Sequence, residues 1–400
     1  MSFFLLSRFS KVFWITSILL LLGWLISIRG FSAYRDLFGT PLGPDFLQFY
    51  TGAKLFIEGR SDQLYDFQLQ IETQSEILHS PQEYLHPYIY PPLLAWGLQP
   101  LAHFDYRVAF LIWSIGGLLI LWSVGKLFRF GFWFALGWFP IFATLSYGQN
   151  SFLSLGVVAL IGWLWVQRGA LFLAGLSTGL LLYKPQLFVA FVPIFLILKE
   201  WRILQGMVVS GAFYLAISFY FVPEQSWAFY RFAMERIPLL VAAPGFPITQ
   251  FFDPNGFFRL LFPQMSSWIH KTFSIVVMLL FLRLFWLWLK SIPVENKAIR
   301  FAGAILILPW TNLYFLVYDW TLLLIAYGIL KNQSKIFEGE QGRWGIGLLW
   351  IVALVSCSIS KGMQAQCGFA VQLAPLVLGY FTYQFFMGPS RLKGNSVGTI

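Results

Sequence analysis

Charged residues are scarce in this 400-residue chain, where Asp, Glu, Lys and Arg together make up 11%, against roughly 25% in soluble proteins. Cysteine and histidine are rarer still, with two and four copies. Two cysteines are too few for a disulfide framework. No HExxH, CxxC or Gly-rich P-loop motif occurs, so the sequence predicts no metal and no cofactor, and a nucleotide-driven pump is excluded.

Apolar side chains are abundant instead: 58% of the chain is hydrophobic and 20% is aromatic. A water-soluble fold of this length cannot bury so much apolar surface, whereas a membrane-spanning helix requires about 20 mostly apolar residues. We therefore predict an all-α polytopic membrane protein with about 12 spans, forming a single integral membrane domain over residues 1–400. The candidate spans are 12–28, 107–126, 132–147, 152–166, 170–182, 187–198, 203–222, 268–289, 298–313, 318–330, 344–360 and 368–387.

Basic residues gather on one side of this topology, which indicates its orientation. With both termini in the cytoplasm, the short outer loops hold only Lys184 and Lys361. Fifteen basic residues then fall inside: Arg8, Lys11, Lys126, Arg129, Arg168, Lys199, Arg202, Lys290, Lys297, Arg300, Lys331, Lys335, Arg343, Arg391 and Lys393. This asymmetry follows the positive-inside rule of a plasma (inner) membrane protein. No basic run lies on one helical face, so nucleic acid is excluded as a partner.

Two large loops are predicted on the extracytoplasmic side, at 29–106 and 223–267. Long loops translocate largely regardless of charge, so their acidic residues do not contradict this orientation. Within the first loop, the apolar stretch Pro91–His103 is too short to span the membrane. It is predicted to form a juxtamembrane helix in the outer interface.

Asp45 is the carboxylate whose surroundings are most informative. Apolar and aromatic neighbours in 43–50 are expected to raise its pKa and make it useful as a general base. An ordinary alternative is that Asp45, following Pro44, caps the N-terminus of a helix.

Lys184 lies between two short apolar segments, and Asp319 is the other ionisable residue near the apolar region on the outer side. A charge at the bilayer centre costs about 2.5–3.5 kcal/mol on insertion scales, so such residues are usually functional or paired. Lys184 either neutralises Asp319 or binds the phosphate of a ligand.

Two further groups have both a binding interpretation and a plain one. Gln149 and Asn150, at a tight outer turn, can hydrogen-bond a polar ligand or simply form the turn. Tyr90, beside Pro91 and Pro92, can contact a lipid or sugar ring or belong to an interfacial aromatic belt.

Taken in order, these motifs make the chain resemble glycosyltransferase family 87, whose members are GT-C-type membrane enzymes that include polyprenyl-phosphate-mannose-dependent mannosyltransferases. The motifs are Asp45-Phe46, Tyr50, Gly59, Leu64-Tyr65-Asp66, Tyr90-Pro91-Pro92-Leu93, Gly148-Gln149-Asn150, Ala174-Gly175-Leu176, Lys184-Pro185-Gln186-Leu187 and Tyr318-Asp319, spread over residues 12–330. The resemblance implies inverting transfer of a mannose-like or other hexose or pentose. The donor would be a polyprenyl-phosphate-sugar, and the acceptor a lipid or glycan hydroxyl at the extracytoplasmic face.

The same resemblance implies roles for individual residues. Asp45 would be the catalytic base, because GT-C enzymes carry an acidic residue just after the first span. The residues implied in donor or acceptor binding are Lys184, Gln149, Asn150, Tyr90, Gln186, Asp319, Arg231 and Arg236. The chain lacks the His that some mycobacterial members have before the tenth span, where Asn312 and Tyr314 stand, so the identities of sugar and acceptor are not carried over.

Two other functions are compatible with a multi-span chain. A transporter or flippase of lipid-linked or small polar substrates would show two related halves, but the 29–106 loop has no counterpart in the second half. A non-catalytic scaffold or lipid-binding subunit is the remaining alternative. Long extracytoplasmic loops with clustered carboxylates favour an enzyme that works at the membrane interface.

Overall fold

The computed structural model describes residues 2–29, 33–82, 84–243, 246–333 and 340–387. The described residues form helices and connecting segments, with no strand beyond the isolated bridges Arg35–Pro41 and Phe251–Leu316. The predicted all-α class is therefore confirmed.

The helices follow one another along the chain as α1 (Ser2–Ser27), α2 (Pro44–Ile57), η2 (Ser61–Gln63), α3 (Phe67–Ile77), α4 (Pro92–Gly97), α5 (Gln99–Ala102), α6 (Tyr106–Leu127), α7 (Phe132–Leu136), α8 (Phe139–Tyr147), α9 (Ser151–Gly162), η3 (Trp163–Gln167), α10 (Leu171–Thr178), η4 (Gly179–Tyr183), α11 (Pro185–Leu198), α12 (Trp201–Phe221), α13 (Pro223–Glu235), α14 (Ile237–Ala242), η5 (Ile248–Gln250), α15 (Pro254–Leu261), α16 (Ser267–Leu289), α17 (Lys297–Thr311), η6 (Val317–Leu322), α18 (Leu323–Gln333), α19 (Glu340–Cys367) and α20 (Leu373–Met387).

Four helices among the described residues are long and apolar enough to cross a membrane: α6, α12, α16 and the 344–367 part of α19. Shorter apolar helices of 10–17 residues also occur, including α11 and α20. These helices support the predicted membrane protein, while the count of twelve spans stays a prediction.

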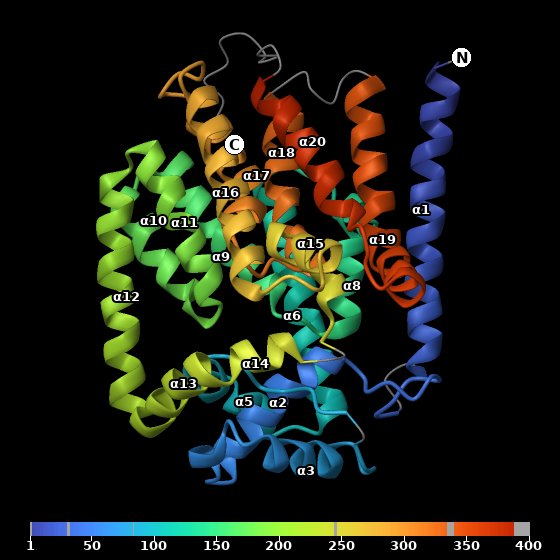
Figure 1. Cartoon of the computed structure of the whole chain (residues 1–400), viewed down its shortest axis with the longest axis vertical. Helices are drawn as coiled ribbons and strands as arrows, with labels where there is room; N and C mark the ends of the chain where they lie inside the picture. Colours follow the sequence, from blue (N-terminus) through green and yellow to red (C-terminus); the bar gives the residue numbers. More distant parts are fainter. Residues whose placement is uncertain (1, 30–32, 83, 244–245, 334–339, 388–400) are drawn as a thin grey trace.

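The first large loop and α13 of the second lie at one end of the molecule, whereas α15 lies nearer its middle, as Figure 1 shows. α1 begins and α20 ends near the upper edge of that view, whereas α2, α3 and α13 lie along the lower edge. The 29–106 and 223–267 loops meet there, because Gln225 of α13 donates to Ser61 (2.9 Å) and Phe232 stacks on Tyr65. Which end faces the cytoplasm stays a prediction.

Buried glutamines hold the first loop together. Gln70 and Gln74 of α3 accept hydrogen bonds from the backbone N–H groups of Tyr88 (2.8 Å) and His86 (3.1 Å). Tyr65 donates to the carbonyl of Tyr90 (2.9 Å). The extended segment that leads to Tyr90 therefore has a defined path. The apolar stretch after it forms two short helices, α4 and α5, instead of the single helix predicted for Pro91–His103.

The chain around Lys184 consists of half-length helices. α10 continues as the 3₁₀ turn η4, and α11 starts at Pro185, directly after Lys184. Figure 1 shows α10 and α11 beside the much longer α12. Gly175 of α10 touches the backbone of Gly206 in α12, where a Cβ would lie 2.8 Å from the Gly206 Cα. Small residues at such crossings allow helices to pack closely in membranes. The helix α10, which leads to Lys184 through η4, is therefore packed closely against α12.

Candidate active site

Asp45 lies in the first turn of α2 but does not cap it. The N-cap is Gly43, with a φ of 59°, followed by Pro44 at the first helical position. The ring of Phe110 occupies the place of a Gly43 Cβ, so close packing and the left-handed backbone both require glycine. The capping interpretation of Asp45 is therefore wrong. Its carboxylate instead accepts a hydrogen bond from Gln149 Nε2 (3.1 Å).

The surroundings of Asp45 favour its neutral form. Burial raises the pKa of this carboxyl from 3.8 to about 7, while the Gln149 hydrogen bond and the positive charge of Lys184 lower it. Pro44 and Phe46 on either side are buried, yet Asp45 itself is partly exposed. A carboxyl with a pKa near neutrality that remains accessible is suited to general base catalysis.

Gln149 is placed beside Asp45 by a left-handed turn between α8 and α9. Gly148 has a φ of 69°, and Phe46 fills the space of its missing Cβ. The Gln149 amide uses both ends, since Oε1 accepts the Asn150 N–H (2.8 Å) while Nε2 donates to Asp45. Tyr90 lies near the same amide: burial raises its pKa, as do Asp45 and Asp319, while the Gln149 interaction lowers it.

The side-chain amide of Asn150, unlike that of Gln149, makes no hydrogen bond to a described residue. The residue is fully buried, and neither Nδ2 nor Oδ1 has a hydrogen-bond partner within the described chain. Buried amides are normally satisfied by protein, water or ligand. Asn150 therefore offers one donor group and one acceptor to a molecule that enters this region.

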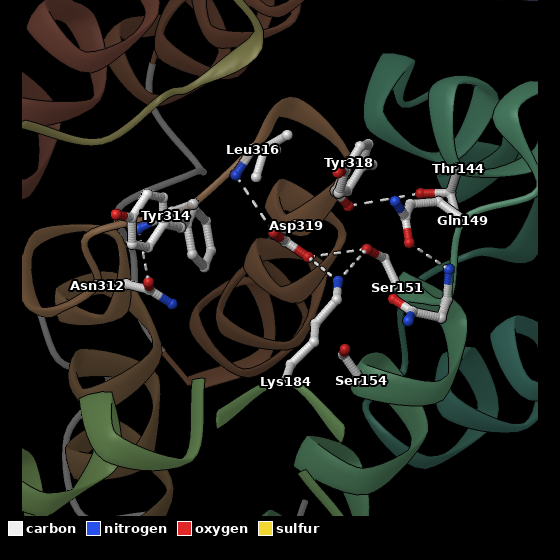
Figure 2. Close-up of polar contacts among 12 residues, drawn as sticks. Thr144, Gln149, Ser151, Ser154, Lys184, Asn312, Tyr314, Leu316, Tyr318 and Asp319 are labelled. Atoms are coloured by element: carbon white, nitrogen blue, oxygen red, sulfur yellow. Dashed lines mark hydrogen bonds and ion pairs between the residues drawn. The ribbon is translucent and has the colours of Figure 1, made fainter. Parts of the chain in front are cut away.

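Lys184 and Asp319 form a buried ion pair, shown in Figure 2, with Nζ 2.8 Å from Oδ1. Ser151 joins them, donating to the same Oδ1 (2.8 Å) and accepting from Nζ (3.3 Å). The pairing interpretation of Lys184 is thus present in the structure. These two hydrogen bonds do not use the full capacity of the Lys184 ammonium, because an ammonium has three N–H donors.

Three separate elements supply this cluster. Lys184 precedes α11, Ser151 begins α9, and Asp319 lies in the 3₁₀ turn η6. The Leu316 N–H donates to Asp319 Oδ2 (3.2 Å) and orients the carboxylate. Ser151, which accepts from Lys184, lies two residues after Gln149, which donates to Asp45. The ion pair is therefore near the candidate base, and the Lys184 charge lowers the pKa of Asp45.

The remaining predicted residues are less closely connected to Asp45. Gln186 is half-buried in the first turn of α11. Arg231 and Arg236 are exposed, on α13 and at its end, and neither forms an ion pair with a described residue. Asn312 and Tyr314 are bonded locally, through the Tyr314 N–H and the Asn312 side chain (2.9 Å).

Asp253 has a position that the sequence interpretation missed. It is completely buried and caps α15 through the Gly256 N–H (2.9 Å). Its other oxygen accepts the Phe315 N–H (2.7 Å), next to the Leu316 N–H that reaches Asp319. The Asp253-Pro254 pair is a helix-start signal visible in sequence, but the bond to a residue 62 positions later is not.

Metal ligands are not grouped in the described residues, where no three His, Cys, Asp or Glu side chains are placed to hold an ion. The site therefore consists of a carboxyl, an ion pair, amides and phenols.

Comparison with known proteins identifies one family. The model of glycosyltransferase family 87 matches residues 88–328, more than half of the chain. This range includes Tyr90, Gln149, Lys184 and Asp319 but begins after Asp45. No curated protein and no solved structure matches the chain.

Proposed function

The chain belongs to glycosyltransferase family 87, and we propose that its donor is a polyprenyl-phosphate-sugar and its acceptor a hydroxyl group of a lipid or glycan. Family membership makes it a glycosyltransferase. The proposal adds that transfer takes place at the extracytoplasmic face of the plasma membrane and inverts the anomeric carbon.

One observation carries the proposal: an accessible carboxyl with a pKa near 7 lies within the electrostatic reach of a buried ammonium. Sugar transfer from a phosphate donor needs both groups. A base must remove the acceptor proton, and a cation must stabilise the charge that develops on the leaving phosphate. Asp45 and Lys184 are suited to these two roles.

The proposed reaction is a single displacement. The acceptor hydroxyl gives its proton to Asp45, and its oxygen forms a bond to the anomeric carbon. The bond from that carbon to the phosphate oxygen breaks, and its electron pair stays on the phosphate. A phosphodiester with one negative charge becomes a monoester with up to two, so a cation matters most as the leaving group departs.

Lys184 has the capacity to meet that charge while it stays paired. Two of its N–H directions are used by Asp319 and Ser151, and an ammonium has three. The third makes no hydrogen bond to a described residue, although Nζ also lies 5.3 Å from the centre of the Tyr318 ring. We assign this N–H to a phosphate oxygen, in a charge-assisted hydrogen bond. Arg231 and Arg236 are secondary candidates for the phosphate, because they are exposed, on α13 and at its C-terminal end.

Sugar or acceptor hydroxyl groups would be bound by the amides and phenols around Asp45. The idle amide of Asn150 has the strongest case, because leaving a buried polar group unpaired costs about 1–3 kcal/mol. Gln149, Gln186 and Tyr90 complete the proposed set. Such a polar lining discriminates between sugars through hydrogen bonds that a wrong sugar leaves unmade.

The test is a transfer assay with the purified protein in sealed proteoliposomes. Polyprenyl-phosphate hexoses and pentoses are each offered with a panel of lipid and glycan acceptors, and nucleotide-sugars serve as comparison donors. We expect a new glycoside, detected by mass spectrometry, from the lipid-linked donors alone. Transfer only from nucleotide-sugars would overturn the donor assignment, and movement of the lipid-linked sugar across the bilayer without a new glycosidic bond would favour a flippase.

A further inference from the structure

The carboxylate of Asp253 connects the second large loop to the segment that carries Asp319. Its Oδ1 accepts the Gly256 N–H of α15 (2.9 Å), and its Oδ2 accepts the Phe315 N–H (2.7 Å). The residue has no solvent exposure. Each oxygen is therefore bound to a different part of the chain.

The link continues directly to the ion pair. Next to the Phe315 N–H, the Leu316 N–H donates to Asp319 Oδ2 (3.2 Å), while Asp319 Oδ1 holds Lys184 (2.8 Å). Two consecutive backbone N–H groups are thus accepted by two carboxylates. Any shift of this segment moves the carboxylate that holds the Lys184 ammonium.

Capping of α15 does not by itself require a carboxylate. Asn or Ser caps a helix about as well as Asp, because a single acceptor oxygen is enough. The bond to Phe315 is what needs the second oxygen, because the first already accepts the Gly256 N–H. The Phe252 N–H to Phe315 carbonyl bond (2.7 Å) fixes the same segment from its other side.

We propose that Asp253 is a positioning residue for the donor phosphate: through the 315–316 backbone and Asp319 it fixes the place of the Lys184 ammonium. Asp253 then contributes to donor binding without touching the donor. This inference rests on the proposed function, because it takes Lys184 as the partner of the phosphate.

The test is a double-mutant cycle on binding of farnesyl phosphate, an isoprenoid phosphate without a sugar, to the purified full-length protein. Asp253→Asn keeps one acceptor oxygen for α15 and turns an amide N–H₂ toward the Phe315 N–H. We expect about tenfold weaker binding from the lost hydrogen bond. In the Lys184→Met background the same change should cause no further loss, because the ammonium that Asp253 positions is gone.

Asp66→Asn is the matched control, since Asp66 caps α3 on the exposed surface and makes no second link. It should leave binding unchanged. If Asp253→Asn does not fold, Asp253→Glu takes its place. This variant keeps both oxygens but displaces them, so the same dependence on Lys184 is expected.

Two results would overturn the assignment while leaving the proposed function intact. One is wild-type affinity in Asp253→Asn. The other is an equal loss with and without Lys184, which would make Asp253 a helix cap and nothing more. If the wild-type protein itself bound no isoprenoid phosphate and transferred no sugar, the proposed function would fail and this inference with it.

Discussion

Replacing Asp45 by Asn should change activity and stability in opposite directions. The Asn side chain keeps an oxygen that can accept the Gln149 hydrogen bond, but it cannot take a proton from the acceptor. Loss of a general base lowers the rate by about 10²- to 10⁴-fold. Binding of the donor should persist, because the phosphate is assigned to Lys184.

The stability effect follows from the raised pKa. Burial makes the Asp45 carboxylate costly in the folded protein, and the rise from 3.8 to about 7 corresponds to about 4 kcal/mol above pH 7. This cost is absent below the unfolded pKa and grows as pH increases toward the folded pKa. Because solvent reaches the partly exposed carboxylate and screens it, we expect about 1–3 kcal/mol. The Asn variant avoids this cost and should melt at a higher temperature than wild type at pH 8, with a smaller difference at pH 5.5.

The assay pairs sugar transfer with thermal denaturation of the same preparations at both pH values. Asp66→Asn makes the same chemical change at an exposed helix cap in the same loop and should leave both measurements unchanged. Wild-type turnover in Asp45→Asn would remove Asp45 from the mechanism. A variant that melts below wild type at pH 8 would refute the argument from burial.

Four further outcomes follow from the site and the topology. The ratio kcat/KM should rise with pH and level off above about 7, as Asp45 becomes charged; a flat profile from pH 5 to 8 would contradict its role. Lys184→Met combined with Asp319→Asn should fold, since the Asn oxygen still accepts from Leu316, yet bind donor roughly 10- to 150-fold more weakly. Wild-type affinity in that double variant would reduce Lys184 to a partner of Asp319. With both native cysteines replaced, Asp62→Cys should react with an impermeant thiol reagent from outside and Glu295→Cys only from inside; the reverse pattern would invert the topology. Chelator should leave transfer intact, and its abolition would reveal a metal requirement.

The class of the fold and the unusual chain path at Lys184 were predictable because both depend on local composition. Long apolar runs specify helices, and the two short apolar segments on either side of Lys184 correspond to α10 with η4 and to α11. The pairing of Lys184 with Asp319 was one of two alternatives that the sequence left open. Asp319 could be named as the partner because ionisable groups are rare in the apolar regions. The break between α4 and α5 was not predicted, although Pro100 stands just after it.

The finer geometry depends on contacts between distant segments, which no local pattern contains. Whether Asp45 caps α2 is decided by Gly43, whose backbone turns left-handed against the Phe110 ring from α6. The bond from Asp253 to Phe315 joins loops 62 residues apart. The idle amide of Asn150 likewise depends on which neighbours the fold brings near it.

The measurement that tests the central claim most directly is the anomeric configuration of the product, determined by NMR after transfer from a polyprenyl-phosphate-sugar of known configuration. A single displacement, with Asp45 as base and the phosphate leaving toward Lys184, predicts complete inversion. Retention of configuration would contradict the account, because it requires a second displacement through a covalent glycosyl intermediate and a carboxylate that acts as a nucleophile.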